Sequence, residues 1–371
     1  MYLEEIRLVD SFISIVTLLV IGLVMLTIPL LVTRVFKNHV YLPLALFLLS
    51  NGVLAIDSLV QAKAEEWYQI YTAFTFLFIF TLCPSLRLYV DGMTSQHSWQ
   101  LNRNSAYKYI LVLPALGVTA LILLLPEESH HAIFKEDSDV LSPMSIFLVL
   151  SIVVMLCFWV GQCVITIIHI FKRLRRYRSQ LKQVFSNNDD KELNWLNYVL
   201  IFAIVAWCIS LIAVLISNIY NHWLFTPEAE AVLYLVLIWS LSHFGLQQTP
   251  CLIAANGDEQ KDSAVLSTNS EAEDQESATK YQRSALDDKR AERIANKISL
   301  AMKDDSLYLD ADLSLQKLAS VTGISANYIS QTLNQTLNSN FFDFVNRWRV
   351  EAAKPLIIEN QDTVLNIALD V

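Results

Sequence analysis

The stretch that decides the fold is Ser11–Val32, SFISIVTLLVIGLVMLTIPLLV, which contains no charged side chain. A helix needs about 20 mostly apolar residues to cross the hydrocarbon core of a bilayer, and this run is long enough. A cleaved signal peptide would have a shorter apolar region with basic residues before it and a small-residue cleavage site after it, whereas Glu4 and Glu5 precede this run. We therefore predict a retained membrane helix.

Comparable runs recur through the first two-thirds of the chain. Of the 371 residues, 54% are hydrophobic, and they gather in long blocks instead of being spread among short amphipathic elements. The predicted spans are Phe12–Val32, Tyr41–Val60, Ile70–Val90, Tyr107–Leu125, Met144–Ile170, Trp195–Ser217 and Ala229–Leu246. The sequence therefore predicts an all-α fold that begins with a seven-helix transmembrane bundle.

The basic residues between the runs predict how the bundle is oriented. Lys and Arg accumulate in cytoplasmic loops. The connection after the fifth run contains KRLRRYRSQLK (residues 172–182), whereas NHWLFTPEAE (residues 221–230) has no Lys or Arg. Connections rich and poor in basic residues alternate along the chain. We therefore expect the amino terminus outside and everything after Leu246 in the cytoplasm.

Three polar side chains inside the runs are candidate ligand-sensing residues. A carboxylate within a membrane is costly, so Asp57 is a candidate for ligand or ion contact, although a hydrated or helix-paired carboxylate also explains it. Asn51 and Gln162 lie near the predicted middle of the membrane. They either line a ligand pocket or make hydrogen bonds between helices.

The sequence offers little for catalysis or cofactor binding. The five cysteines form no C-x-x-C pair, and H-E-x-x-H, G-x-S-x-G and P-loop motifs do not occur. His130 and His131 lie in an acidic predicted outer loop, where they either bind a metal ion or are solvated. We predict that the protein is not an enzyme, with no catalytic residue, no cofactor and no metal site.

The character of the chain changes after residue 250. Residues 251–280 include NGDEQKDSAVLSTNSEAEDQESATK, which has almost no large apolar side chain and predicts a flexible acidic linker between the membrane domain, residues 1–250, and a cytoplasmic domain, residues 281–371. Structure resumes with Ser284 as a predicted helix cap. An apolar stripe follows at helical spacing: Ala291, Ile294, Ala295, Ile298 and Met302.

The stretch LSLQKLASVTGISANYISQTLN (residues 313–334) predicts two short helices joined at Gly323. Ser314 and Ser325 are predicted to cap the two helices. The second helix presents short polar side chains suited to hydrogen bonds with base edges: Asn327, Ser330, Gln331 and Asn334. Helix pairs of this kind also occur in many proteins that do not bind DNA.

From about Tyr281 the chain resembles the DNA-binding domain of the AraC/XylS family of bacterial transcription regulators. The residues that carry the resemblance are LSLQKLASVTGISANYISQTLNQTLNSNFFDFVNRWRVEAAKPLI (residues 313–357) and DTVLNIALDV (residues 362–371). The resemblance implies two helix–turn–helix units on a connecting helix, with Asn327, Ser330 and Gln331 reaching bases. It also implies that Arg347 and Arg349 on the connecting helix pack or touch phosphates. A multi-helix membrane sensor before such a domain is an uncommon variant of this family, so the resemblance places the protein in the bacterial inner membrane.

The chain stops at Val371, inside the first helix of the second unit, so a natural truncation and a fragment both remain open. Acidic residues slightly outnumber basic ones after Tyr281, which predicts weak attraction to phosphates. Pro355 is expected to bend the connecting helix or end it early.

The sequence thus predicts a membrane-tethered transcription regulator. Its expected partners are promoter DNA, the lipid bilayer and an unidentified small-molecule or membrane ligand, and a homodimeric state is left open. The alternative is a membrane receptor or transporter whose C-terminal helices form a protein-interaction module.

Overall fold

The structure is a computed structural model that describes residues 2–97, 99–134, 142–189, 191–220, 226–252, 288–359 and 362–371. The chain divides into two compact units. The membrane unit comprises Met1–Arg173 and Asn194–Pro250, and the C-terminal unit comprises Leu174–Leu193 and Cys251–Val371. The segment Leu174–Leu193 therefore belongs with the C-terminal helices, whereas the sequence analysis grouped it with the membrane helices.

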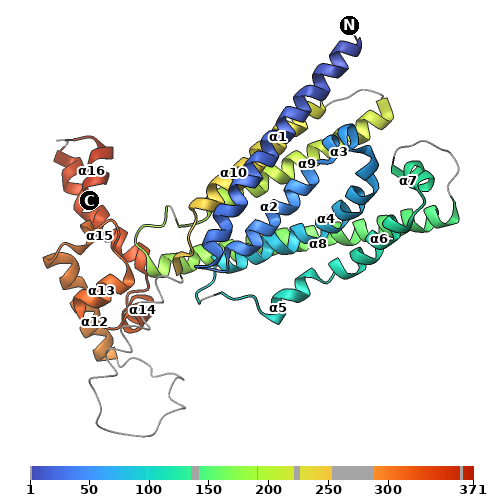
Figure 1. The fold of residues 1–371 in the computed structure, drawn as a ribbon. Coiled ribbons are helices and arrows are strands. Elements are labelled where there is room, and N and C mark those ends of the chain that lie inside the picture. The colour runs from blue at the N-terminus through green and yellow to red at the C-terminus, as the bar shows by residue number, and fades with distance from the viewer. Residues whose placement is uncertain are drawn as a thin grey trace, which may run out of the picture. The chain divides into compact units, whose positions relative to one another are not determined.

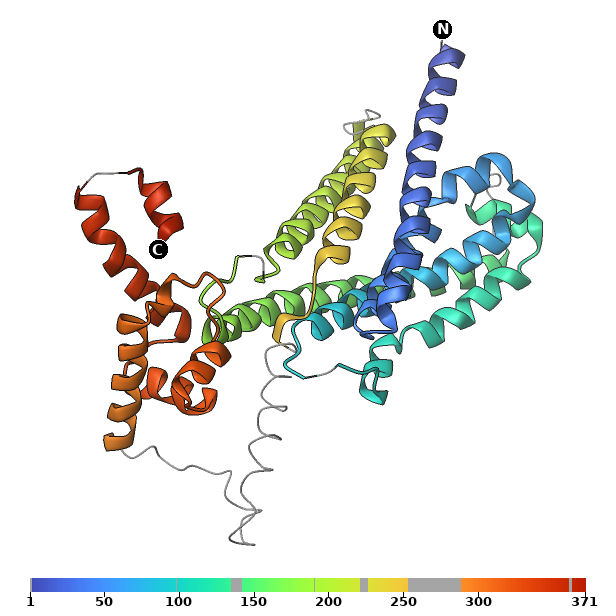
Figure 2. The same ribbon diagram turned by 60° about the vertical axis from the view of Figure 1, so that its left-hand side comes forward.

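The fold is all-α, as predicted (Figures 1 and 2). The membrane unit contains α1 (Tyr2–Val35), α2 (Tyr41–Ala55), α3 (Asp57–Lys63), η1 (Glu65–Trp67), α4 (Tyr68–Met93), α5 (Arg103–Ala106), η2 (Tyr107–Tyr109), α6 (Val112–Leu124), α7 (Glu127–Phe134), α8 (Pro143–Val184, to Arg173 in this unit), α9 (Asn194–Tyr220) and α10 (Pro227–Gln247). The C-terminal unit contains the end of α8, α12 (Asp288–Asp304), η3 (Leu307–Leu309), α13 (Leu315–Thr322), α14 (Ala326–Gln335), α15 (Phe341–Glu359) and α16 (Val364–Asp370).

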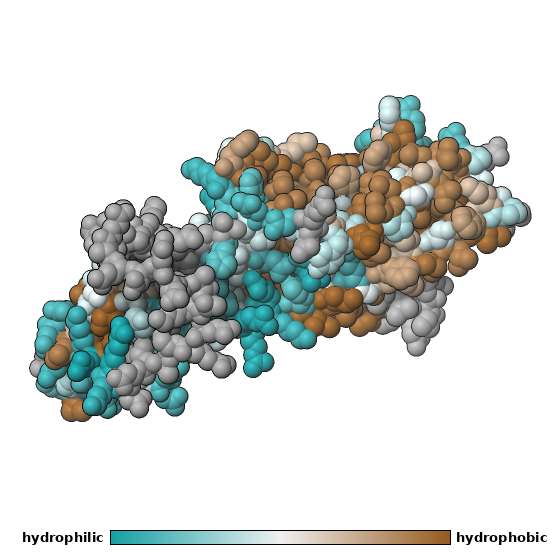
Figure 3. All heavy atoms as spheres, turned by 90° about the horizontal axis from the view of Figure 1, so that it is seen from below, coloured by the Kyte–Doolittle hydropathy of each residue, from teal (hydrophilic) through white to brown (hydrophobic). Residues whose placement is uncertain are grey.

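Within the described residues, six helices are long and apolar enough to cross a membrane. They are Ser11–Val35, Tyr41–Gln61, Glu65–Met93, Tyr107–Leu124, Pro143–Val184 and Glu228–Gln247. Their outward faces are apolar, with Met25 68% and Leu26 71% exposed, and Figure 3 shows large hydrophobic areas on this unit. Such an exterior suits lipid and not water, so this is a multi-pass helical membrane protein.

Six of the seven predicted runs are thereby confirmed as candidate spans. The remaining run, Trp195–Ser217, is helical within α9. The part of α9 whose side chains are described supplies only the shorter apolar helix Asn194–Ile209. Whether the chain has a seventh span stays a prediction.

Close backbone approach and hydrogen bonds between helices hold the membrane unit together. A Cβ built on Gly245 of α10 would lie 2.6 Å from Leu44 Cδ2 of α2, so these two helices approach closely at that point. The Tyr71 hydroxyl of α4 donates to the Val53 carbonyl of α2 at 2.8 Å. The hydrophobic effect does not drive helices together in lipid, so packing contacts and hydrogen bonds of this kind hold membrane helices together instead.

An ion-paired cluster joins α4 to η2 and α8. Asp91 Oδ2 lies 2.7 Å from Lys108 Nζ, and Asp91 Oδ1 lies 2.8 Å from His169 Nε2. The side chains of Lys108 and Asp91 are only 13% and 18% exposed. Because a partly buried charge that loses its partner stays desolvated, this carboxylate links the three elements strongly.

We predict that Asp91→Asn lowers the melting temperature of the purified protein by several degrees, because Lys108 would keep a desolvated charge without a counter-ion. The measurement is thermal unfolding followed by tryptophan fluorescence. Glu127→Gln is the matched control, since the Glu127 side chain is 82% exposed. Equal melting temperatures for the two variants would refute a structural role for the cluster.

The C-terminal unit has a core of its own. The predicted stripe on α12 is buried, with Ile298 and Met302 0% exposed, and it packs against Leu318 of α13, Ile329 of α14 and Val345 of α15. The α15 helix continues through Pro355 to Glu359, so the early end expected at that proline is wrong. The predicted linker beyond Leu252 and the Ser284 cap lie outside the described residues.

Candidate functional site

Local capping builds the α13–α14 pair as predicted. The Ser314 side chain accepts a hydrogen bond from the Lys317 backbone N–H at 3.2 Å, and the Ser325 side chain accepts one from the Tyr328 N–H. Gly323 ends α13 with φ of 63°, in the left-handed region that an L-side chain adopts only under strain. The caps and the glycine thus fix where each helix starts and stops.

The outward face of α14 carries the four predicted base-contacting residues. Asn327 and Asn334 are exposed, and Ser330 and Gln331 are partly buried. Asn334 Nδ2 donates to the Ser330 carbonyl at 2.9 Å, and Gln331 Nε2 donates to Gln335 Oε1 at 3.0 Å. These four residues share one polar helix face, and their role in contacting bases stays a prediction.

A basic hollow on α12, which the sequence analysis missed, lies beside this helix pair. A cavity of about 420 Å³ is lined by Arg290, Arg293 and Lys297 of α12 and by the turn Gly323–Ser325. The Arg290 guanidinium lies 4.5 Å from the centre of the Tyr328 ring. The three cations recur at i, i+3 and i+7, so they share a helix face. That spacing can be read from the sequence. The slight excess of acidic residues in the whole region nevertheless gave no reason to expect a basic surface.

Arg349 occupies a bonded position inside the C-terminal unit. Its guanidinium donates to the Tyr308 carbonyl at 2.7 Å and to the Asp310 carbonyl at 2.8 Å. Burial lowers the pKa of Arg349 and the nearby Asp310 opposes that shift, while the hydrogen bond from Lys317 holds the pKa of Asp310 below its usual value. Of the two roles considered for Arg349, packing is the one whose contacts are visible. Arg347, two residues earlier, is exposed.

The segment Leu174–Leu193, called the stem below, contacts the loop between η3 and α13. Ser186 N–H and Oγ both donate to the Leu313 carbonyl, at 3.1 and 2.7 Å, directly before the Ser314 cap. Arg349 Nη2 lies 3.4 Å from Ser186 Oγ. Asn334 Nδ2 also donates to Gln183 Oε1 of the stem at 3.2 Å. Arg349 of α15 therefore contacts both the stem and the loop before α13.

We predict that Arg349→Ala makes residues 303–313 of the full-length protein more sensitive to trypsin, because the Tyr308 and Asp310 carbonyls lose a charged donor worth about 2 kcal/mol. The measurement is the initial rate of cleavage at Lys303. The control is Arg347→Ala, which removes an exposed arginine from the same helix. Identical cleavage rates for both variants would show that Arg349 does not hold the loop.

The three candidate sensing residues lie in separate surroundings. Gln162 of α8 donates to the Lys108 carbonyl of η2 at 3.2 Å, as the interhelical alternative required. Asn51 of α2 accepts the Tyr234 hydroxyl of α10 on its carbonyl oxygen at 2.8 Å and lies 3.1 Å from it through Oδ1. Asp57 is exposed at the start of α3. No contact joins these three residues to one another in the described part of the chain.

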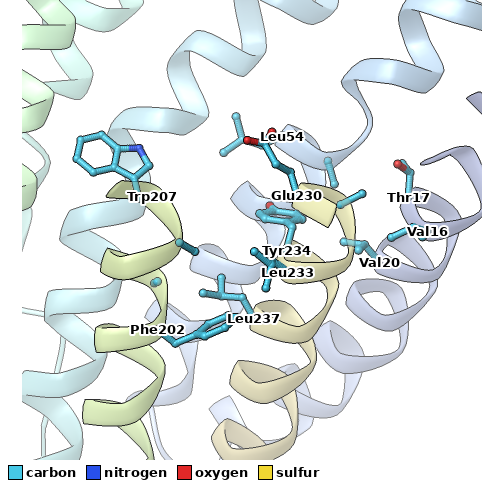
Figure 4. A pocket seen from close by; sticks show the side chains of 14 residues that line it. Val16, Thr17, Val20, Leu54, Phe202, Trp207, Glu230, Leu233, Tyr234 and Leu237 are labelled. Carbon is cyan, nitrogen blue, oxygen red and sulfur yellow. The ribbon is translucent and has the colours of Figure 1, made fainter. Parts of the chain in front are cut away.

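Beside the Asn51–Tyr234 contact lies a cavity of about 530 Å³ (Figure 4). Four helices form its walls: α1, α2, α9 and α10. Most of the lining is apolar, and the polar exceptions include Thr17, Glu230 and Tyr234. A mostly apolar cavity of this size with a few polar groups is typical of small-molecule sites.

Comparison with protein-family models, with curated proteins and with solved structures found no match to this chain. The resemblance to the AraC/XylS DNA-binding domain therefore stays a prediction. No group of three or more potential metal-binding side chains occurs among the residues that the structure describes.

Proposed function

We propose that the protein is a membrane-tethered transcription regulator that senses a stimulus through its membrane helices and binds promoter DNA with α13 and α14. The observation that carries the proposal is the pairing of two surfaces: a polar face on α14 and a basic hollow on α12 next to the turn that starts α14. Base contacts give sequence specificity, and phosphate contacts give affinity and register. A duplex reader needs both surfaces.

In this proposal α14 enters the major groove. Asn327 and Gln331 offer amide groups that pair with adenine through two hydrogen bonds, and Ser330 serves as donor or acceptor. Arg293 and Lys297 then neutralise phosphates of the flanking backbone. The region as a whole is slightly acidic, but attraction to phosphates depends on where the basic residues gather, and here they gather on one face of α12.

The stem supplies a route by which the membrane unit influences the reader. The α8 helix continues without a break from Pro143 to Val184, so its membrane part and the first half of the stem are one element. Ser186 follows directly and binds Leu313, next to the cap of α13. We therefore propose that a change in α8 is transmitted to α13 through the Ser186–Leu313 contact. The ligand must favour one of two states of the membrane helices for this to happen.

The proposed location is the bacterial inner membrane, with the amino terminus outside and the C-terminal unit in the cytoplasm, an orientation that requires α9 to supply the seventh span. The alternation of basic residues between the spans supports this orientation. The α14 helix would then lie in the same compartment as promoter DNA.

One observation favours a protein-interaction module as a second candidate function. The last two helices expose large apolar side chains, with Ile358 of α15 83% exposed and Leu365 and Leu369 of α16 70% and 78% exposed. Exposed apolar side chains at this density are typical of a surface that packs against further protein.

We predict that Arg293→Ala weakens binding of the purified full-length protein to a random-sequence DNA duplex at low salt. Because each neutralised phosphate releases a counter-ion, the slope of log K against log salt should become shallower by about one for this variant. The measurement is fluorescence anisotropy of labelled duplex over a series of salt concentrations.

Two comparisons separate the phosphate role from general effects of charge. Lys354→Ala removes an exposed basic residue that is already paired with Glu351 at 2.6 Å, and it should leave the slope unchanged. Asn327→Ala should leave the slope unchanged while altering the sequences enriched from a random duplex library. Absence of duplex binding at low salt would overturn the DNA proposal and favour the interaction module.

A further inference from the structure

We propose that the cavity between α1, α2, α9 and α10 is the sensing site and that it binds an amphiphile with an apolar body and a protonated amine head. This inference deepens the proposed function, since it names the ligand class of the sensor. It rests on that function only for its regulatory consequence, because binding to the cavity is measurable without DNA.

The walls of the cavity fit an apolar ligand body. Val16 and Val20 of α1, Leu54 of α2 and Leu237 of α10 contribute aliphatic side chains, and Phe202 and Trp207 come from α9 (Figure 4). These residues are far apart in sequence, so the cavity exists only in the packed bundle. Its volume of about 530 Å³ is within the range of small-molecule pockets.

Glu230 gives the cavity its chemical preference. Among the described lining residues its carboxylate is the only charged group, and no ion pair joins it to a cation in the described part of the chain. The exposed Glu230 carboxylate attracts a cation, and the apolar walls beside it favour a cation that brings its own apolar surface. The Trp207 and Tyr234 rings of the cavity add surfaces on which a cation is favoured.

A purely structural role for Glu230 would be to stabilise the start of α10, where acidic residues favour the helix dipole. Glu228 already occupies the same first turn. It does not line this cavity but a different hollow, beside Phe12. The two glutamates are therefore equivalent for the dipole and different for the cavity, which makes Glu228 the natural control.

A metal ion does not fit the cavity as well as an organic cation. Metal sites in proteins gather several oxygen, nitrogen or sulfur ligands. Among the described residues that line the cavity, Glu230 is the one acidic residue, and none is a histidine or a cysteine. The Tyr234 hydroxyl is already engaged by Asn51 of α2 at 2.8 Å. That bond holds the Tyr234 side chain at the wall in advance of ligand binding, so Asn51 acts as a positioning residue for the cavity.

The test uses the full-length protein in nanodiscs of zwitterionic phosphatidylcholine. The probes are a long-chain primary amine brominated at its tail and the brominated alcohol of the same length. Bromine quenches tryptophan fluorescence at short range, so Trp207 reports entry of the tail. Trp207→Phe gives the background from the other tryptophans and from probe dissolved in lipid.

We expect saturable quenching of Trp207 by the amine, with the alcohol binding at least threefold more weakly. Glu230→Gln should weaken the amine about tenfold, the effect of losing one charge-assisted hydrogen bond, and leave the alcohol unchanged. Glu228→Gln should leave both probes unchanged. Retained alcohol binding by Glu230→Gln shows that the variant is folded.

Three results would overturn the inference: equal affinity of the wild-type protein for amine and alcohol, equal effects of Glu230→Gln and Glu228→Gln on amine binding, or no saturable quenching that depends on Trp207. None of these outcomes bears on duplex binding, so the failure of this site and the failure of the DNA proposal are distinguishable. Conversely, an amine site in a protein that fails to bind duplex DNA would leave the cavity assigned and the regulator function refuted.

Discussion

The constraint on which the structure depends is that a hydrocarbon core offers no hydrogen-bond partner to a polypeptide backbone. Every N–H and C=O at that depth must be paired within the chain, and continuous helices achieve this most directly. The six candidate spans satisfy the requirement and turn apolar side chains outward, as the 71% exposure of Leu26 illustrates. Polar side chains are then restricted to helix contacts such as Tyr71 with Val53 and Tyr234 with Asn51.

The C-terminal unit is stabilised differently, because water can form hydrogen bonds with its backbone and the hydrophobic effect can drive its packing. Ile298, Leu318, Ile329 and Val345 are all 0% exposed and form one small core. Around this core the short helices depend on local devices, namely the two serine caps and the positive φ of Gly323. The polar face of α14 is left free of the core.

Within the C-terminal unit the stem makes polar contacts and also buries apolar side chains, with Tyr177 1% and Leu181 0% exposed. Ser186 reaches Leu313 with both its backbone and its side chain, and Arg349 joins the same loop to α15. Polar contacts of this kind are weaker than a hydrophobic interface, and each contributes about 1 kcal/mol.

Features governed by neighbouring residues were predictable from the sequence. The apolar runs fixed the candidate spans, and Ser314, Gly323 and Ser325 fixed the boundaries of α13 and α14, because length, capping and backbone sterics act within a few residues. Pro355 shows the limit of this reasoning, since the helix continues through the proline to Glu359 although the residues from Lys354 to Glu359 are exposed, and the bend expected there stays a prediction.

Features that depend on distant pairs were not predictable. The Asp91–Lys108–His169 cluster joins residues up to 78 positions apart, and the Tyr234–Asn51 bond joins residues 183 positions apart. The cavity containing Glu230 exists only once four helices have packed. Arg349 was visible in the sequence, but its carbonyl partners in η3 and its neighbour Ser186 in the stem were not.

The central claim is that apolar helices in a bilayer hold a DNA-binding face of α14 on the cytoplasmic side. The most direct measurement is the labelling rate of Asn327→Cys, in a variant whose native cysteines are replaced, with a maleimide that does not cross membranes. The account predicts rapid labelling in inside-out vesicles that slows when duplex DNA is added, and no labelling in intact spheroplasts. Labelling in spheroplasts, or a rate in vesicles that duplex DNA leaves unchanged, would contradict it.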